Sequence, residues 1–224
     1  MASVRKTANC IGVSGDFSIV HDFFGYAAVP KTLSLLSQVR LVKGKHIAIN
    51  VIRVGLELFS FNDERILDLG VQTAREIFAP AALGIGRVEH YGISLDDADG
   101  HEDIDSDCEA TALTDAWTVP NHAIDVFIVR VYTPSGIGIS PTDGPCDKDA
   151  KGPTGVIIAI DETRNFNGMD LTGKTLAHEV SHYLGLDDSN DDDSNLMSAS
   201  TNGVAITTSQ GKTIRCHCFV DQGC

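Results

Sequence analysis

Three side chains, His178, Glu179 and His182, have the types and the spacing of a catalytic metal site. Residues four apart lie on one face of a helix, so the two histidines can present imidazole nitrogens to one metal ion. Glu179 then points toward the open side of that ion, where hydrolytic zinc sites hold a water. The pattern predicts a zinc ion whose bound water is activated by Glu179 to attack a peptide carbonyl.

The residues after His182 predict a third ligand. Gly185 allows a left-handed backbone conformation, which ends a helix and reverses the chain. We expect this reversal to return Asp188 to the ion held by the two histidines, leaving one position open for water. An aspartate ligand also adds negative charge, which makes the ion a somewhat weaker Lewis acid.

The positions around the histidines indicate a helix with one apolar side. Four apolar residues recur there at helical spacing: Leu176, Val180, Tyr183 and Leu184. Histidines that only fill a core usually fall among such apolar positions. His178 and His182 lie on the opposite side, which favours a metal site over a pair of core histidines.

The stretch from Thr172 to Met197 resembles the metzincin clan of zinc peptidases, whose signature His-Glu-x-x-His-x-x-Gly-x-x ends in His or, in snapalysin-like members, in Asp. Metzincins also carry a methionine turn beneath the metal, and Ser194-Asn195-Leu196-Met197 looks like that turn. The resemblance, to a snapalysin-like or archaemetzincin-like variant, implies zinc binding by His178, His182 and Asp188, catalysis by Glu179, helix termination by Gly185 and a structural methionine at Met197. Some metzincins have a tyrosine two residues after this methionine to assist the transition state, whereas this chain has Ala199.

A weaker likeness to the same clan covers about residues 47–210. In metzincins, a short edge strand before the metal helix pairs with extended substrate, because the unpaired backbone groups of an edge capture a peptide. The candidate edge strand here is Ile137, Gly138, Ile139 and Ser140. A plain glycine-rich loop is the alternative.

At 224 residues, the chain is predicted to form a single catalytic domain. We expect an α+β fold of the metzincin type with α/β-like character: a twisted mixed sheet, backing helices, the active-site helix and a small irregular C-terminal subdomain. Residues 41–185 would form the upper subdomain, residues 186–224 the lower one, and residues 1–40 a segment of unclear role. The expected strands are 47–58, 87–95, 124–132 and 155–160, and the expected helices are 172–184, 207–215 and one from Asn62 or Asp63 to Phe78.

The formal net charge of −14 is concentrated in two segments. Asp96 to Glu109 contains eight acidic residues and Asp187 to Asp193 contains five, whereas the remainder of the chain is nearly neutral. No basic face is evident, which argues against nucleic acid as a partner. Aspartates alternate around a glycine between Leu95 and Asp107, which suits calcium because this ion prefers oxygen ligands; a solvated acidic loop is the alternative.

Six cysteines, an even number, predict three disulfides in a secreted protein. The alternative is a structural zinc site of Cys216, His217, Cys218 and Cys224, although paired Cys-x-x-Cys spacing is absent. Cys10 is expected to be half of a disulfide rather than a thiolate that blocks the active zinc. No apolar run is long enough to span a bilayer, and no N-terminal segment has the charged start and apolar stretch of an export signal.

Together, these patterns predict a secreted zinc endopeptidase that acts on peptides or proteins. Two alternatives stay open. A metal-stabilised binding module would keep the zinc but have weak turnover or none, and another His-Glu-x-x-His hydrolase, such as a deformylase-like amidase, would take its third ligand from elsewhere. Residues Ser198 to Gly203 are expected to line the specificity pocket. The preferred peptide bond and the oligomeric state do not follow from the sequence.

Overall fold

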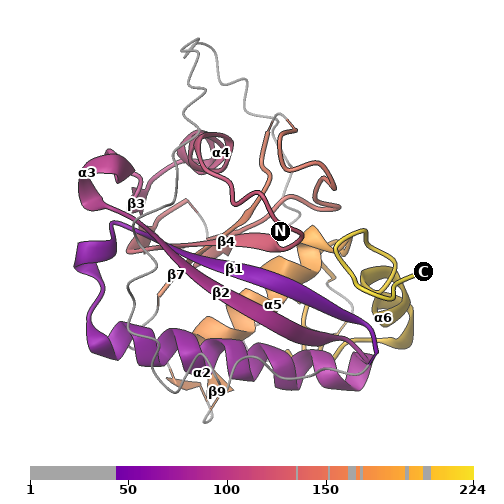
Figure 1. Cartoon of the computed structure of the whole chain (residues 1–224). Coiled ribbons are helices and arrows are strands. Elements are labelled where there is room, and N and C mark those ends of the chain that lie inside the picture. The colour runs from indigo at the N-terminus through magenta and orange to yellow at the C-terminus, as the bar shows by residue number, and fades with distance from the viewer. Residues whose placement is uncertain are drawn as a thin grey trace.

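The structure is a computed structural model that describes residues 44–134, 136–150, 152–160, 165–166, 169–189, 192–198 and 203–224 (Figure 1). The predictions for residues 1–40, Cys10, Ala199 and residues 199–202 of the specificity pocket lie outside this part of the chain. A five-stranded mixed sheet in the order β2-β1-β4-β7-β6 lies between layers of helices (Figure 1). The predicted fold class, a mixed sheet backed by helices, is therefore confirmed.

The first four strands of this order run parallel, and the fifth is antiparallel to its neighbour. The five strands are β1 His46–Val54, β2 Gly84–Ile93, β4 Ile124–Val129, β6 Gly138–Ile139 and β7 Val156–Ala159. Parallel strands are buried on both faces, which explains their nearly continuous apolar sequences. In β1, for example, Ile49 and Val51 belong to one apolar cluster, and Ile52 and Val54 belong to the other.

Helices cover both faces of the sheet. Helix α2 Phe61–Phe78 and helix α5 Leu171–Tyr183 contribute to the cluster on one face. Helix α4 Asp107–Ala116 contributes Ala110 and Leu113 to the cluster on the other face (Figure 1). The remaining elements are the strands β3 Asp103–Ile104, β5 Val131–Tyr132, β8 Asn165–Phe166 and β9 Met169–Asp170, the helices α3 Leu95–Ala98 and α6 Thr208–Ile214, and the 3-10 turns η1 Leu56–Leu58 and η2 Ala79–Ala81.

The first predicted strand was too long at its C-terminal end. It stops at Val54 instead of Leu58, because Gly55 has φ 73° and turns the chain into η1. The strand predicted over residues 124–132 is divided into β4 and β5. Arg130 N donates to Glu102 O at 2.7 Å, and β5 pairs with β3 outside the main sheet.

The predicted start of α2 was wrong by a few residues. Ser60, rather than Asn62 or Asp63, is the N-cap: its hydroxyl accepts from Asp63 N at 3.3 Å, and Asp63 Oδ2 accepts from Ser60 N at 2.6 Å. This reciprocal pair satisfies two backbone donors that the first helical turn leaves without partners. Asp63 is therefore the third residue of the helix and closes the cap from inside.

The acidic segment from Asp96 to Glu109 contains the end of α3, a turn, β3 and the start of α4. Ser94 caps α3 by accepting from Asp97 N at 3.1 Å, and Ser106 caps α4 by accepting from Glu109 N at 3.3 Å. Negative charge in a first helical turn complements the helix dipole, which gives these acids a structural role. Within the described chain, this segment does not bring three metal-ligand atoms together, so the calcium prediction gains no support.

Two disulfides tie down the C-terminal segment: Cys146 pairs with Cys218, and Cys216 pairs with Cys224. Cys108 is disulfide-bonded as well. The disulfide prediction is confirmed for Cys146, Cys216, Cys218 and Cys224, and these bonds occupy the sulfurs that the alternative zinc site would use. None of the described helices combines the length and the apolar character that crossing a bilayer requires.

Candidate metal centre

Helix α5 carries both histidines, and their ring nitrogens converge. His178 Nε2 and His182 Nε2 lie 3.0 Å apart. Asp188 Oδ1 lies 3.2 Å from His182 Nε2 and 3.6 Å from His178 Nε2. The structure therefore brings all three predicted ligands to one point, at which Asp188 is exposed and the two histidines are largely buried.

A Schellman turn at the end of α5 returns the chain toward the histidines. Gly185 has φ 98°, in the left-handed region that glycine adopts without a steric penalty. Gly185 N donates to His182 O at 2.9 Å, and Leu186 N donates to Ser181 O at 3.0 Å, which are the two bonds of this motif. The turn at Gly185 thus sets where Asp188 lies.

Backbone carbonyls fix the orientation of both imidazole rings. His178 Nδ1 lies 2.8 Å from Leu196 O, and His182 Nδ1 lies 2.7 Å from Leu186 O. Because a carbonyl oxygen only accepts, each Nδ1 carries the proton and each Nε2 presents a lone pair. Bonds of this kind to the second ring nitrogen are what hold metal-binding histidines in one tautomer and one orientation.

Three electron-rich atoms at such distances repel one another unless a cation lies between them. Burial, and then the neighbouring His182, lower the pKa of His178, so this ring favours its neutral form. Nitrogen and oxygen atoms that each lie about 2.0–2.2 Å from one tetrahedral zinc ion are about 3.3–3.6 Å from each other, close to the separations seen here. The donor set of two imidazoles and one carboxylate, together with its spacing, therefore fits zinc.

A tight turn that ends at Met197 connects two of the ligands. Met197 is fully buried, and its N–H donates to Asn195 Oδ1 at 2.9 Å. Its carbonyl accepts from Ser189 N at 2.8 Å, and Ser189 is next to Asp188. The residue before Met197 provides the carbonyl that anchors His178. This turn therefore braces one histidine and the aspartate at the same time.

Glu179 follows His178 in α5 and is buried, with 8% of its surface exposed. Burial raises the pKa of its carboxyl to about 8, and the carboxylate of Asp188 adds to the rise. A carboxyl tuned toward neutral pH can accept a proton and release it again within one reaction cycle. A divalent cation bound nearby would lower this pKa by its charge.

The terminal strand of the described sheet passes beside Glu179. Ala159 N donates to Ile137 O at 2.8 Å, so the backbone carbonyl of Ile137 points toward β7. In an antiparallel pair, the backbone groups of successive residues point alternately toward the partner strand and away from it. The N–H and C=O of Gly138 therefore point toward the free edge of the described sheet. A Cβ atom on Gly138 would lie only 2.9 Å from Glu179 Cγ. Glycine is therefore needed for this close approach. Of the four candidate edge residues, Gly138 and Ile139 form β6, and Ile137 and Ser140 lie on either side of it.

One side chain near the centre was missed in the sequence, and another was quoted in the methionine turn without a role of its own. Lys174 is buried one helical turn before His178, and burial lowers its pKa. Its spacing of four from His178 is the signal that places both on one face. Asn195 forms the turn before Met197 and accepts from Gln210 Nε2 at 3.0 Å. Asparagine is a common residue in such turns, because its side chain bonds to nearby backbone groups.

Comparison with solved structures identifies a similar fold. The crystal structure of archaemetzincin (amzA) from Methanopyrus kandleri matches with a TM-score of 0.51 and 10% sequence identity, over 78% of this chain and 97% of that chain. This chain has an archaemetzincin-like fold. No model of a known protein family matches the sequence, and no curated protein matches it. At this identity the likeness establishes the fold, so the chemistry must be argued from the side chains.

Proposed function

We propose that this protein is a zinc-dependent peptidase of the metzincin type. The observation that carries the proposal is the convergence of two Nε2 lone pairs and one carboxylate oxygen, from His178, His182 and Asp188, beside the buried carboxyl of Glu179. A pair of histidines with only a packing role would not hold two acceptor nitrogens 3.0 Å apart with both protons on the outer atoms. The archaemetzincin-like fold supports the same class of reaction.

In this proposal, each side chain of the centre has one task. His178, His182 and Asp188 would hold a zinc ion, and the ion would supply Lewis acidity for a water molecule and for the peptide carbonyl. Glu179 accepts a proton from the attacking water and then passes it to the leaving amine. The carbonyls of Leu186 and Leu196 keep both imidazoles in the tautomer that presents Nε2. Burial of Glu179 keeps bulk water from competing for its proton.

We propose that the substrate is an extended peptide bound along β6. The outward N–H and C=O of Gly138 would pair with the peptide main chain, as in the addition of a strand to a sheet edge. Because Gly138 lies against Glu179, a peptide at this edge has a carbonyl close to the catalytic carboxyl. Main-chain pairing along an open edge requires no chain terminus, which fits an endopeptidase.

Glu179→Ala tests the catalytic assignment. The variant should bind one zinc ion per chain, as measured by metal analysis, while its casein hydrolysis falls by about 100-fold to 10,000-fold, the usual contribution of a general base. A chelator should abolish hydrolysis by the parent, and added zinc should restore it. If Glu179→Ala hydrolyses casein as fast as the parent and a chelator stops both, this mechanism is wrong. A parent that binds zinc but cleaves neither casein nor a peptide library is a binding module.

Asp188→Ala tests the third ligand, with Asp187→Ala as its matched control. Both aspartates are exposed and adjacent, but only Asp188 has its carboxylate against the two histidines. The dissociation constant for zinc should rise at least tenfold in Asp188→Ala and stay unchanged in Asp187→Ala. If zinc is held as tightly without Asp188, the third ligand lies elsewhere, as in other hydrolases with the His-Glu-x-x-His motif.

We also propose that the protein acts outside the reducing cytosol. Disulfides persist in extracellular and other oxidising compartments, and two of them hold the C-terminal segment in place. Thiol titration of the folded protein, purified without reductant, should find Cys146, Cys216, Cys218 and Cys224 unreactive. Reactive thiols at these positions would show that the protein is native to a reducing compartment.

A further inference from the structure

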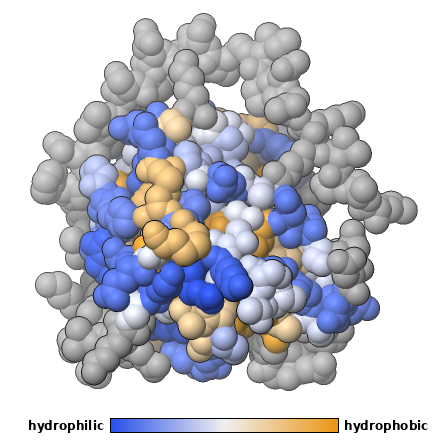
Figure 2. All heavy atoms as spheres, turned by 90° about the vertical axis from the view of Figure 1, so that its right-hand side faces the viewer, coloured by the Kyte–Doolittle hydropathy of each residue, from blue (hydrophilic) through white to orange (hydrophobic). Residues whose placement is uncertain are grey.

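A cavity of about 680 Å³ lies between η2 and α6 and shares no lining residue with the metal centre. Its described lining contains three cationic side chains, Lys45, Arg75 and Arg215, and no carboxylate. This is unexpected in a chain whose formal net charge is −14. Figure 2 views the molecule from the side on which α6 and the C-terminus lie in Figure 1, and strongly hydrophilic and apolar side chains adjoin one another on this face.

The two arginines are held in place by the walls of the cavity. Arg75 Nε donates to Ile85 O at 3.0 Å. Arg215 Nη1 donates to Ala81 O, which links α6 to η2 across the cavity. A guanidinium has five N–H donors in a fixed plane, so one such bond orients Arg215 and leaves donors for a ligand. Cations that are fixed in advance bind an anion with less loss of side-chain entropy.

The rest of the wall determines what kind of anion fits. The cavity is too large for a bare oxyanion and has the volume of a small-molecule site. Several of its other lining side chains are apolar: Ala79, Pro80, Ala81, Leu83, Ile85 and Ile206. Apolar walls with a few convergent charges are suited to a ligand that joins an apolar body to one charged group.

The chain's own N-terminal segment is a poor match for this cavity. Gly44, which lines the cavity, follows residues 1–43 in the sequence. Residues 1–43 contain five basic and two acidic residues, which gives them the same sign of charge as the cavity. Electrostatic complementarity therefore favours a separate, negatively charged ligand.

We propose that the cavity between η2 and α6 binds a small organic anion that carries a carboxylate or phosphate group on an apolar body. Arg215 binds the anionic group, with Lys45 adding charge at the rim. The apolar residues of η2 and β2 pack against the body of the ligand. This site does not depend on the peptidase reaction.

Three probes of similar size test the proposal: phenyl phosphate, benzoate and the neutral benzyl alcohol. Each is titrated into the full chain at constant ionic strength, and NMR follows the backbone amides of Gly84 and Gly211, which line the cavity. We expect saturable shifts with a dissociation constant of about 1 mM or lower for at least one anion, and binding of benzyl alcohol at least tenfold weaker. The ratio of phenyl phosphate to benzoate affinity identifies which anionic group the site prefers.

Lys45→Gln and Lys212→Gln form a matched pair of variants. Lys45 lines the cavity, whereas Lys212 is exposed on α6 and does not. Neither substitution removes a backbone hydrogen bond of a cavity wall. Anion affinity should fall at least threefold in Lys45→Gln and stay unchanged in Lys212→Gln. The proposal is overturned if benzyl alcohol binds as tightly as the anions, or if Lys45→Gln and Lys212→Gln lose the same amount of anion affinity. It is also overturned if neither anion produces a saturable shift.

Discussion

Two groups of three potential metal ligands lie at different places in the fold. They are the α5 trio, His178, His182 and Asp188, and the cysteine trio, Cys146, His217 and Cys218, and in each the ligand atoms lie within 4.8 Å of one another. In the α5 trio, the hydrogen bonds are made by the outer ring nitrogens, which leaves both Nε2 lone pairs and a carboxylate oxygen facing one point.

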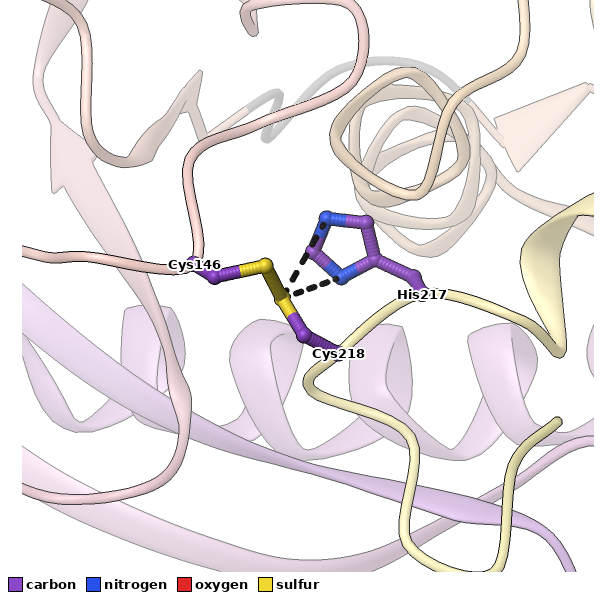
Figure 3. A group of neighbouring side chains, drawn as sticks. All are labelled: Cys146, His217 and Cys218. Carbon is purple, nitrogen blue, oxygen red and sulfur yellow. Dashed lines mark hydrogen bonds between the residues drawn. A yellow bond between two sulfur atoms is a disulfide. The ribbon is translucent and has the colours of Figure 1, made fainter.

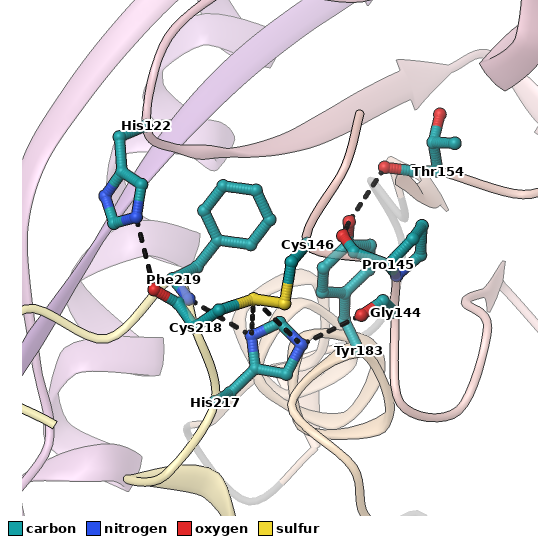
Figure 4. Close-up of a disulfide and its surroundings, with 9 residues drawn as sticks. All are labelled: His122, Gly144, Pro145, Cys146, Thr154, Tyr183, His217, Cys218 and Phe219. Atoms are coloured by element: carbon teal, nitrogen blue, oxygen red, sulfur yellow. Dashed lines mark hydrogen bonds between the residues drawn. A yellow bond between two sulfur atoms is a disulfide. The ribbon is translucent and has the colours of Figure 1, made fainter. Parts of the chain in front are cut away.

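In the cysteine trio, the ligand atoms are already committed (Figures 3 and 4). The two sulfurs are bonded to each other. His217 Nε2 lies 2.9 Å from Gly144 O, and its Nδ1 accepts from Phe219 N at 3.3 Å. The loop that carries Gly144 is also joined to α5, because Gly144 N donates to Tyr183 O at 2.7 Å. The cysteine trio therefore works as a clamp between the C-terminal segment and the end of the metal helix.

The comparison teaches that proximity of ligand types does not by itself make a metal site. What distinguishes the two trios is whether the lone pairs have other partners. A buried polar group must be paired, and a disulfide or a carbonyl can satisfy it as well as a metal can. The histidines of the α5 trio are satisfied only on their outer side, so the inner side is available for zinc.

The largest effect should follow from removing one histidine of each trio. His182→Ala should reduce bound zinc from one ion per chain to a small fraction of that and abolish hydrolysis, because two ligands hold zinc far more weakly than three. His217→Ala should keep full zinc content. Metal analysis after dialysis against a weak chelator measures both. If His217→Ala loses zinc while His182→Ala keeps it, the roles of the trios are reversed.

Removing the disulfide should affect stability and not metal binding. Cys146→Ser with Cys218→Ser opens a link between residues 72 apart in sequence. Loop-closure entropy predicts a loss of about 4 kcal/mol in the free energy of unfolding, or a fall of about 10 °C in Tm. Calorimetry of the zinc-loaded protein gives the value. Zinc content at 20 °C should be unchanged; its loss would mean that the clamp holds a zinc ligand.

Two glycines, one near the α5 trio and one near the cysteine trio, provide a finer contrast. A Cβ on Gly138 would meet Glu179 Cγ at 2.9 Å, and a Cβ on Gly144 would meet the ring of Tyr183 at 2.5 Å. Gly138→Ala should displace the catalytic carboxyl and lower kcat/KM by about 10-fold to 100-fold. Gly144→Ala should lower Tm by a few degrees and leave kcat/KM nearly unchanged below the transition. Equal effects of both variants on kcat/KM would remove the proposed link between β6 and Glu179.

The smallest effect concerns the titration of Glu179 in the metal-free protein. Its pKa is about 8 in the folded state against an ordinary value of 4.5. The folded chain therefore binds this proton more tightly than the unfolded chain, and the associated stability is lost as the pH rises from about 4.5 to about 8. Glu179→Gln should unfold at about the same temperature as the parent near pH 4.5 and several degrees higher at pH 8, in the presence of chelator. If the difference in unfolding temperature between Glu179→Gln and the parent is the same at both pH values, the carboxyl of Glu179 is not buried and protonated as described.

The local parts of the centre could be predicted from the sequence, because their geometry is set within a few residues. The spacing of four between His178 and His182 fixes their common face once a helix forms. Gly185 ends that helix through a turn that spans only six residues. The predicted range 172–184 differs from the observed α5 Leu171–Tyr183 by one residue at each end. Alternating and continuous apolar runs likewise located the main strands.

Other features could not be predicted, because they depend on partners that are distant along the chain. The carbonyl that anchors His178 belongs to Leu196, 18 residues later. The N-cap of α2 was misassigned, since Asn62, Asp63 and Ser60 are all plausible caps and only the backbone geometry selects one. The acidic segment was expected to bind calcium or to form a solvated loop, and its repeated aspartates gave no sign that α3 ends and α4 begins within it.

The sequence alone determined the chemical types of the candidate centre: two imidazoles, a carboxylate and a neighbouring glutamate at spacings that a helix and a turn convert directly into geometry. Only the tertiary structure decided which lone pairs are left for a metal, which cysteines pair, and that Gly138 lies against Glu179. The physical reason is that hydrogen-bond partners and close contacts across the fold arise when separate elements pack, and local spacing carries no record of that packing.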